Sequence, residues 1–447
     1  MPTADDGLAP RRAAFRVLEA VRAGRPLDAA LDEGVKRLSE INRRLAHELT
    51  AGVLRRQGAL DTQLRPLATR GWEKVAEPLR TVLRLGAYQL TELDRVPAHA
   101  AVSTSVELAR DVGGARAAGF VNAVLRQLVR ARAAGNAAAT GAGTKAAAKP
   151  GREARALAER HSHPVWLVQR WLARFGAGET ERLLEWNNSR PRLVVQPARW
   201  SHDELVQAFT AAGLATEPAP FGAGVAVPRG RPDRLAGYAE GGFVVQDPAQ
   251  ALVAWYADLP PGALVYDACA APGGKTIGLA RSGGVRVLAA DASKERVRRL
   301  RENLERAGSG RELALAADAL HPPVRAVDAA LLDAPCLGTG TFARHPDARL
   351  RVTPEALAEL ADRQRALLES VAAVVRPGGL LVYATCSLEP EENELQVERF
   401  LSRHPEFKRE PADDFPPGLL TEKGDLMTLP QRNRMDGAFA ARLRRAA

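Results

Sequence analysis

Two cysteines stand directly after stretches that are typical of buried strands. Cys336 closes the sequence DAPC (residues 333–336), and Cys386 lies in ATCS (residues 384–387), each after an apolar run. We expect the two runs to be neighbouring strands of one sheet, so that both thiols reach the same edge. Two thiols at one edge favour covalent catalysis, in which a thiolate adds to a carbon and is later expelled. A lone cysteine is more often a small buried side chain, which is our expectation for Cys269.

A glycine turn follows the strand predicted at residues 263–268. In this turn, CAAPGGKT, Gly273 and Gly274 let the backbone approach a ligand closely before the next helix begins, which indicates a nucleotide-like cofactor. The ending GGKT resembles a phosphate-binding loop, but that motif needs a glycine at the position of Cys269. ATP hydrolysis is therefore disfavoured.

Aspartates end three further predicted strands, at Asp291, Asp318 and Asp333. The carboxyl ends of parallel strands share one edge of a sheet, so these side chains are expected near the glycine turn. Asp291 is expected to accept hydrogen bonds from ribose hydroxyls, and Asp318 to lie on the adenine side. Any one aspartate could merely cap a helix or a turn, but three along one edge favour a ligand site.

A thiol pair suits methyl transfer to carbon 5 of cytosine. That carbon is a poor nucleophile until a thiolate adds to C6 and makes the ring enamine-like. Afterwards the C5 proton must leave and the thiol must be eliminated, which calls for a second group able to act as a base. Because a free thiol is mostly protonated at neutral pH, Lys275 or Arg344 is expected to help its ionisation. Asp333 is expected to hydrogen-bond the pyrimidine edge and to favour N3 protonation.

The elements that must position these residues alternate between strand and helix from about residue 241. The runs ALVYDA, RVLAAD, LALAAD, VDAALLD and LLVYATC predict a mainly parallel sheet covered on both faces. Upstream, helical apolar spacing predicts an all-α domain. We therefore expect a helical domain at residues 1–135, a flexible Ala/Gly linker at 136–155, a small α/β connecting domain at 156–240 and the sheet domain at 241–447.

Charge and cysteine content limit the class of protein. The 447-residue chain has a net charge of +10, and residues 1–135, with 22 basic and 15 acidic side chains, carry +7 of it. This excess fits a polyanionic partner, although a general bias toward arginine is the alternative. Three cysteines without CxxC spacing predict neither a disulfide framework nor a metal site. No signal sequence or membrane-spanning run is apparent, so a cytoplasmic protein without a membrane partner is expected.

The motifs together resemble the bacterial 16S ribosomal RNA cytosine-5 methyltransferases of the RsmB family, also called Sun or Fmu. DACAAPGGKT, DAPCLGTGTFARHPDARLR, LVYATCS, PEEN and DGAFAARL carry the resemblance, which covers nearly the whole chain. FVNAVLR, at residues 120–126, is similar to the NusB-like helical RNA-binding domain that this family carries in front. HSHPVWLVQRW and GFVVQDPAQ are similar to its connecting domain and to the start of its catalytic domain.

The resemblance implies a Rossmann-like class I methyltransferase domain that uses S-adenosyl-L-methionine. It implies Cys386 as the nucleophile that attacks C6 and Cys336 as the residue that assists release, a choice that the residue chemistry alone left even. The implied substrate is 16S ribosomal RNA, unassembled or in an assembling subunit, at the family target cytosine 967, and the implied state is a monomer. The implied cofactor contacts are Cys269, through its backbone, Ala270, Ala271, Pro272, Gly273, Gly274, Lys275, Asp291, Asp318 and Asp333.

Two positions depart from the family pattern. Leu337 stands where a small polar residue often follows the Pro-Cys pair, and Gln196-Pro197 interrupts a stretch where an Arg-Val-Asn type of sequence is usual. The first bears on the pocket wall and the second on RNA contacts of the connecting domain. The alternatives are a related methyltransferase acting on another rRNA or tRNA cytosine, and a non-catalytic RNA-binding factor.

Overall fold

The chain divides into two compact units in the computed structural model, which describes residues 4–69, 71–135, 150–228, 230–281, 284–412 and 414–447. The helical unit comprises residues 1–188 together with residues 345–351. The sheet unit comprises residues 189–344 and 352–447. Most of the expected linker, residues 136–149, lies outside the described residues. Among the helices that are described, none is long and apolar enough to cross a membrane.

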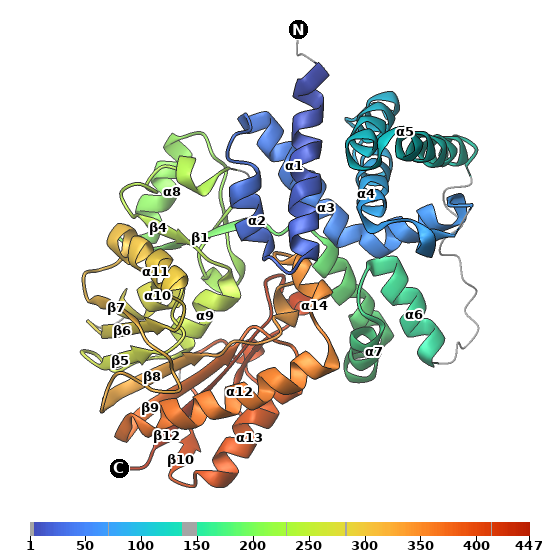
Figure 1. The fold of residues 1–447 in the computed structure, drawn as a ribbon. Coiled ribbons are helices and arrows are strands. Elements are labelled where there is room, and N and C mark those ends of the chain that lie inside the picture. The colour runs from blue at the N-terminus through green and yellow to red at the C-terminus, as the bar shows by residue number, and fades with distance from the viewer. Residues whose placement is uncertain (1–3, 70, 136–149, 229, 282–283, 413) are drawn as a thin grey trace. The chain divides into compact units, whose positions relative to one another are not determined.

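The helical unit packs the apolar faces of its first five helices around one core (Figure 1). Leu49, Val53 and Leu60 recur at helical spacing along α3, and all are buried in that core. Gly114, with φ of +73°, interrupts α5. Helix α6 begins at Pro150, inside the stretch expected as linker, and packs on α7. The elements are α1 Ala4–Arg22, α2 Leu27–Gly34, α3 Glu40–Leu64, η1 Arg65–Leu67, η2 Trp72–Lys74, α4 Glu77–Glu92, α5 Ala98–Ala133, α6 Pro150–His161, α7 Val165–Asn188 and η7 Pro346–Leu350.

A small antiparallel sheet, in the order β2-β3-β1-β4, opens the sheet unit. Val195 of β1, Phe243 of β4 and Phe209 of α8 form its core, with the two phenylalanine rings 5.8 Å apart. Ser201 and Glu204 cap the start of α8 reciprocally, which satisfies two exposed backbone amides. The elements are β1 Leu193–Pro197, α8 His202–Ala211, β2 Glu217–Pro218, η4 Pro220–Gly222, β3 Val225–Val227, η5 Pro232–Arg234 and β4 Phe243–Val245.

The large sheet runs in the order β10-β12-β9-β8-β5-β6-β7, with β11 paired to β12. Strands β5 to β9 are parallel, and β10, β11 and β12 add an antiparallel end that the sequence did not predict. The chain leaves β5 toward β6 and β7 and returns on the other side of β5 as β8. Ligands bind at such a reversal, beyond the carboxyl ends of the strands. The elements are β5 Leu264–Asp267, β6 Arg286–Asp291, β7 Glu312–Ala316, β8 Val327–Asp333, β9 Val375–Thr385, β10 Phe407–Arg409, β11 Leu426–Thr428 and β12 Ala438–Arg445.

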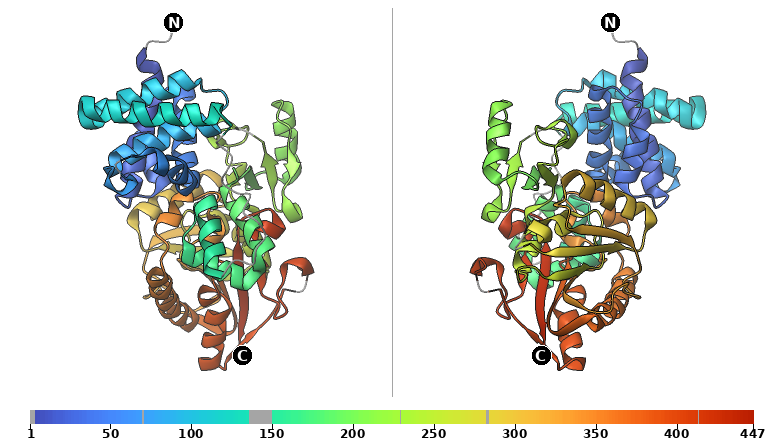
Figure 2. Two further views of the ribbon diagram at one scale, coloured as in Figure 1. Left: turned by 90° about the vertical axis from the view of Figure 1, so that its right-hand side faces the viewer. Right: turned by 90° about the vertical axis from the view of Figure 1, so that its left-hand side faces the viewer.

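Helices cover both faces of the large sheet, as the nearly continuous apolar strands predicted. Val265 and Tyr266 are adjacent on β5 but belong to opposite cores, because side chains alternate along a strand. The Val265 core includes α9, α10 and α11, and the Tyr266 core includes α12 and α13 (Figures 1 and 2). The expected combination of a helical domain, a small middle domain and an α/β sheet is confirmed. The helices are α9 Pro248–Tyr256, α10 Gly274–Arg281, α11 Lys294–Ala307, α12 Pro354–Ala373, α13 Glu394–Arg403 and α14 Pro430–Asn433, with η6 Thr339–Thr341, η8 Pro390–Glu392 and η9 Pro417–Leu419.

Candidate active site

The glycine turn joins β5 to α10 and needs glycine for steric reasons. Gly273 has a φ of +105°, and a Cβ there would lie 2.8 Å from a methyl carbon of Leu300. A Cβ on Gly274 would lie 3.0 Å from the amide nitrogen of Gln246. A side chain at either position would press against these neighbours, so the turn can pack this closely only with glycine.

The other residues of the turn fix its shape. The Ala270 amide donates to the Ala290 carbonyl at 2.8 Å, and Gly273 donates to the Ala270 carbonyl at 2.8 Å. Ala271 is partly buried, and the carbonyl of the exposed Pro272 accepts from the Asn303 amide at 2.9 Å. The Cys269 side chain packs against the Tyr266 core, where burial raises its pKa to about 12. Its thiol is therefore inert at neutral pH, which agrees with a packing side chain.

Asp267 ends β5 beneath the turn and was not singled out from the sequence. Its Oδ2 accepts from the Thr276 hydroxyl at 2.7 Å, and burial raises its pKa to about 7. Its Oδ1 is buried and accepts no hydrogen bond from the described residues. A buried oxygen of this kind needs a donor from a ligand or from water.

Asp291 and Asp318 both follow strands at the same edge but differ in exposure. Asp291 is 1% exposed, and its Oδ1 accepts from the Ser293 amide at 2.9 Å and pairs with Arg296 at 2.9 Å. Its Oδ2 is buried with no partner among the described residues. Asp318 is exposed and accepts from the Leu320 amide at 3.0 Å, so it also shapes the turn after β7.

The two thiols meet at the ends of β8 and β9. These strands are parallel neighbours, with Asp333 opposite Ala384. The Sγ atoms of Cys336 and Cys386 lie 3.3 Å apart, close enough for one to donate to the other. The hydrogen bond to Cys386, followed by burial, raises the pKa of Cys336 well above its usual value. Either sulfur can donate this hydrogen bond, and the raised pKa favours Cys336 as the sulfur that keeps its proton.

Lys275 and Asp333 form an ion pair beside the thiols. Lys275 Nζ lies 2.7 Å from Asp333 Oδ2 and 2.5 Å from the Gln250 side-chain oxygen. Burial alone would lower the pKa of Lys275, but the charge of Asp333 outweighs it, and Cys386 raises the pKa further. The Lys275 ammonium group therefore lies close enough to Cys386 to interact with it electrostatically.

Arg344, the other cation expected to help a thiol, is held elsewhere. Its guanidinium donates to Asp247 at 2.5 Å and to Asp436 at 3.0 Å. Burial and the charge of Asp247 raise the pKa of Asp436 to about 7. Asp247 also caps α9 by accepting from the Ala249 amide at 2.9 Å. Arg344 thus joins the start of α9 to the segment before β12, and Lys275 is the cation placed beside the thiol pair.

The two departures from the family pattern have structural roles. Leu337 is 8% exposed, and its amide donates to Glu392 Oε1 at 3.0 Å, so its backbone is joined to the segment before α13. The Gln196 amide donates to the Ala223 carbonyl at 2.9 Å and to the Gln246 carbonyl at 3.3 Å. This side chain therefore fastens the small sheet to the segment that leads to α9.

A segment that follows the Pro-Cys motif belongs to the helical unit. Asp347, 2% exposed, accepts from the Leu27 amide at the start of α2 at 3.2 Å. The buried Arg349 guanidinium donates to the Asn188 side chain at 2.7 Å and to the Asn187 carbonyl. Burial lowers the pKa of Arg349 to about 9. No local sequence pattern predicts this exchange, because the contacts join residues 161 to 320 positions apart.

Comparisons with known proteins agree with this architecture. The family model for the 16S rRNA methyltransferase RsmB/F matches residues 256–444, that for the NusB family matches residues 8–130, and that for the RsmF/B-like ferredoxin-like domain matches residues 163–229. A probable ribosomal RNA small subunit methyltransferase B of Synechocystis is 37% identical, over 98% of this chain and 99% of that protein. The ribosomal RNA small subunit methyltransferase B of Vibrio cholerae is 33% identical, over 96% of this chain and 95% of that protein.

Solved structures are similar as well. The crystal structure of PH0851 has a TM-score of 0.79 at 25% identity and covers 99% of both chains. A methyltransferase homologue from Pyrococcus horikoshii has a TM-score of 0.57 at 27% identity and covers 66% of this chain and 98% of that one. These likenesses span all the parts of the molecule, and the chain belongs to the RsmB family of S-adenosylmethionine-dependent ribosomal RNA small subunit methyltransferases.

Proposed function

We propose that this protein methylates carbon 5 of a cytosine in 16S ribosomal RNA, at the family target cytosine 967, through a covalent bond between Cys386 and C6. The observation that carries the proposal is the thiol pair, with its sulfurs 3.3 Å apart beside the Lys275–Asp333 ion pair. Two thiols in contact, with one cation beside them, suit a reaction in which one sulfur bonds to the ring and is expelled later.

Cys386 is the better nucleophile of the two. It can accept a hydrogen bond from Cys336 and has the Lys275 charge nearby, and each of these contacts stabilises a thiolate. Its lone pair forms the bond to C6, and the C5=C6 electrons become available to C5. Asp333, held by Lys275, hydrogen-bonds the pyrimidine edge and favours protonation at N3 as charge builds up on the ring.

Release reverses the addition. The C5 proton leaves to a base, its electrons restore the C5=C6 bond, and the bond between C6 and the Cys386 sulfur breaks. Cys336 assists because its S–H group can donate a hydrogen bond to the departing sulfur. This bond stabilises the thiolate as it leaves, and the proton stays on Cys336. Without this donor the covalent adduct should persist.

The edge formed by the ends of β5 to β8 fits S-adenosylmethionine, which supplies the methyl group when bound. Backbone groups of residues 269–274 form the glycine turn at this edge, and Asp291 Oδ2 is a buried acceptor suited to ribose hydroxyls. Asp318, Asp333 and Lys275 complete the proposed set. The unpartnered Asp267 Oδ1 is a further acceptor on the same edge.

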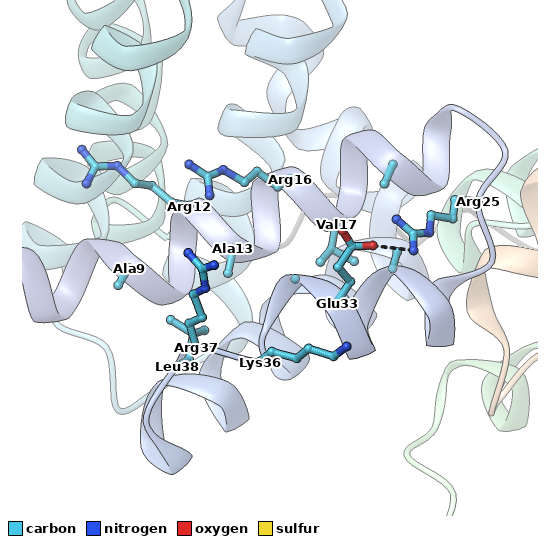
Figure 3. A pocket seen from close by; sticks show the side chains of 13 residues that line it. Ala9, Arg12, Ala13, Arg16, Val17, Arg25, Glu33, Lys36, Arg37 and Leu38 are labelled. Carbon is cyan, nitrogen blue, oxygen red and sulfur yellow. Dashed lines mark ion pairs between the residues drawn. The ribbon is translucent and has the colours of Figure 1, made fainter.

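The helical unit is proposed to hold the RNA. Within residues 1–135, our proposed NusB-like domain, α1 and α2 border a groove of about 670 Å³. Figure 3 shows Arg12, Arg16 and Arg37 toward one end of it, and the Arg25–Glu33 ion pair toward the other. No described carboxylate pairs with Arg16 or Arg37, so both can neutralise phosphates. We also propose that residues 156–240 connect this domain to the catalytic residues 241–447, and that the protein acts as a cytoplasmic monomer.

Trapping the adduct tests the proposal. With radiolabelled 16S RNA and S-adenosylmethionine, Cys336→Ala should accumulate a protein–RNA adduct on denaturing gels, whereas Cys386→Ala should give neither adduct nor methylated RNA. Cys269→Ala is the matched control among the thiols and should form no persistent adduct. An adduct from the Cys386 variant, but none from the Cys336 variant, would reverse the assignment. Mapping 5-methylcytosine in rRNA and tRNA from cells with and without the gene would identify the target and separate the alternatives.

A further inference from the structure

Two buried polar side chains, those of Gln364 and Glu392, form hydrogen bonds with the backbone on both sides of Cys336. The Gln364 side-chain amide, on α12, donates to the Pro335 carbonyl at 2.9 Å and to Glu392 Oε1 at 2.9 Å. The same Glu392 oxygen accepts from the Leu337 amide at 3.0 Å. Gln364 and Glu392 are both fully buried. The peptide groups before and after Cys336 are therefore held by one continuous set of hydrogen bonds.

The set also reaches the strand that carries Cys386. The Tyr383 hydroxyl, on β9, donates to the Glu392 carbonyl at 2.7 Å and lies 3.3 Å from the Gln364 side-chain oxygen. Tyr383 is three residues before Cys386 and is fully buried. The backbone around Cys336 and the Tyr383 side chain, on the strand that leads to Cys386, are thus both bonded to residues Gln364 and Glu392, which limits how far the sulfurs can separate.

Glu392 brings a charge as well as hydrogen bonds. Burial raises its pKa to about 7, although hydrogen bonds from Ser387, Leu337 and Gln364 oppose this. The other ionisable groups that face it are Glu389, Cys336 and the Tyr383 hydroxyl. When Glu392 is ionised, its charge adds to the causes that raise the pKa of Cys336. The carboxyl can therefore change its charge near neutral pH beside the thiol pair.

We propose that Glu392 and Gln364 are positioning residues for the thiol pair: together they hold Cys336 against Cys386, and ionised Glu392 keeps the shared proton on Cys336. The inference rests on the proposed covalent mechanism, which needs the negative charge on Cys386 and a proton on Cys336. The proton stays on the Cys336 sulfur and the negative charge on the Cys386 sulfur. Neither sulfur is oxidised or reduced, so no redox partner takes part.

Replacing Glu392 with glutamine separates its charge from its shape. The amide oxygen of Glu392→Gln can still accept from the Leu337 amide and from Gln364, so Cys336 stays in place. Gln364→Met tests the positioning instead. It removes the hydrogen bond to the Pro335 carbonyl and leaves the Glu392 carboxyl in place. Glu391→Gln removes a charge one residue away and is the matched control.

Competitive alkylation of the full-length protein measures the thiols directly. With limiting iodoacetamide and mass spectrometry of the Cys336 and Cys386 peptides between pH 6 and 9, the wild type should be modified mainly at Cys386. Near pH 7.5 the Cys386 preference should fall about three- to tenfold in Glu392→Gln, because one pKa unit is a tenfold change in thiolate. The preference should also lose its dependence on pH around 7. Glu391→Gln should match the wild type.

Methyl transfer gives the second readout. Gln364→Met should lower kcat at saturating S-adenosylmethionine with little change in the KM for RNA, and should keep the pH step near 7 that Glu392→Gln loses. Wild-type alkylation ratios and pH profiles in Glu392→Gln would overturn the role of its charge. Wild-type kcat in Gln364→Met would overturn the positioning role. Alkylation requires no RNA, so it tests this inference independently of the proposed mechanism. If the alkylation ratios are as expected but Cys386 forms no covalent adduct with RNA, the proposed mechanism is wrong and this inference stands.

Discussion

Both units bury ionisable side chains, but of opposite kinds. In the helical unit the buried histidines have lowered pKa values: burial lowers the pKa of His161 to about 4 and that of His163 well below its usual value. In the sheet unit the buried groups include Asp267, Glu392 and Asp436, whose pKa values burial raises to about 7. Burial thus keeps these two histidines neutral at a pH where an exposed histidine would be protonated. It keeps these three carboxyls protonated at a pH where an exposed carboxyl would be ionised.

The partners of these groups explain the difference. His163 Nε2 lies 3.2 Å from the Asn187 side-chain amide and its Nδ1 lies 2.7 Å from the His161 carbonyl, so the neutral ring is satisfied inside the helices. Asp267 and Glu392 instead lie beside the glycine turn and the Pro-Cys segment, at the carboxyl ends of the strands. Perturbed carboxyls that gather in one place are typical of a reactive site, whereas a hydrogen-bonded buried histidine is typical of a core.

Breaking the charge balance of the reactive site should give the largest effect. Lys275→Met removes the cation beside Cys386 and leaves Asp333 without its ion pair. Loss of one member of a buried pair costs about 3–5 kcal/mol of folding stability. Loss of one oriented charge from a reaction site typically lowers kcat about 100- to 1,000-fold, and we expect a fall of that size. Single-turnover methylation with excess enzyme measures this. RNA affinity, measured by filter binding, should stay near that of the wild type. A normal kcat in Lys275→Met would show that Lys275 has no role in the reaction.

The sequence predicted the reactive edge because strand ends are visible in it. Asp291, Asp333 and both reactive cysteines follow apolar runs, and parallel pairing then brings such positions together. The proximity of Cys336 and Cys386 could be predicted from this argument alone. The antiparallel strands after β9 could not, because pairing partners that lie far apart in the sequence leave no local pattern.

Side-chain partners were harder to predict than positions. Lys275 and Arg344 were equal candidates beside the thiols, and only the packing shows that Arg344 is bound by Asp247 and Asp436, about 90 to 100 residues away. PEEN was noted as a motif, but nothing local indicates that its Glu392 accepts from Leu337, 55 residues earlier. The transfer of residues 345–351 to the helical unit was missed for the same reason.

The opposite titrations predict opposite pH responses of the two units. Between pH 4 and 6.5 the unfolded histidines bind more protons than the folded ones, so the helical unit should gain stability as pH rises. Between about pH 4.5 and 7 the folded carboxyls bind more protons than the unfolded ones, so the sheet unit should lose stability as pH rises. Each fully buried carboxyl contributes on the order of 3 kcal/mol to this loss.

Hydrogen exchange of the full-length protein at pH 5, 6 and 7.5, corrected for intrinsic rates, should resolve the two units peptide by peptide. Protection of the β5, β8 and β9 peptides should fall with pH, while that of the α6 and α7 peptides rises. Asp267→Asn should flatten the slope of the sheet unit and leave the helical unit as it is. If protection changed with pH in the same direction in both units, the proposed difference between their buried ionisable groups would be wrong.

Removing arginines from the groove between α1 and α2 should have the smallest effect. It should weaken RNA binding without changing the rate of methyl transfer. Arg16→Ala and Arg37→Ala each remove one exposed charge from the groove between α1 and α2. Each is expected to weaken RNA binding several-fold and to lower the salt slope by about one phosphate contact. Arg22→Ala, on the same helix but paired with Glu19 and outside the groove, is the matched control. Because the thiol site keeps all its hydrogen bonds, kcat at saturating RNA should be unchanged, and a fall in kcat without a change in the salt slope would place these arginines in another role.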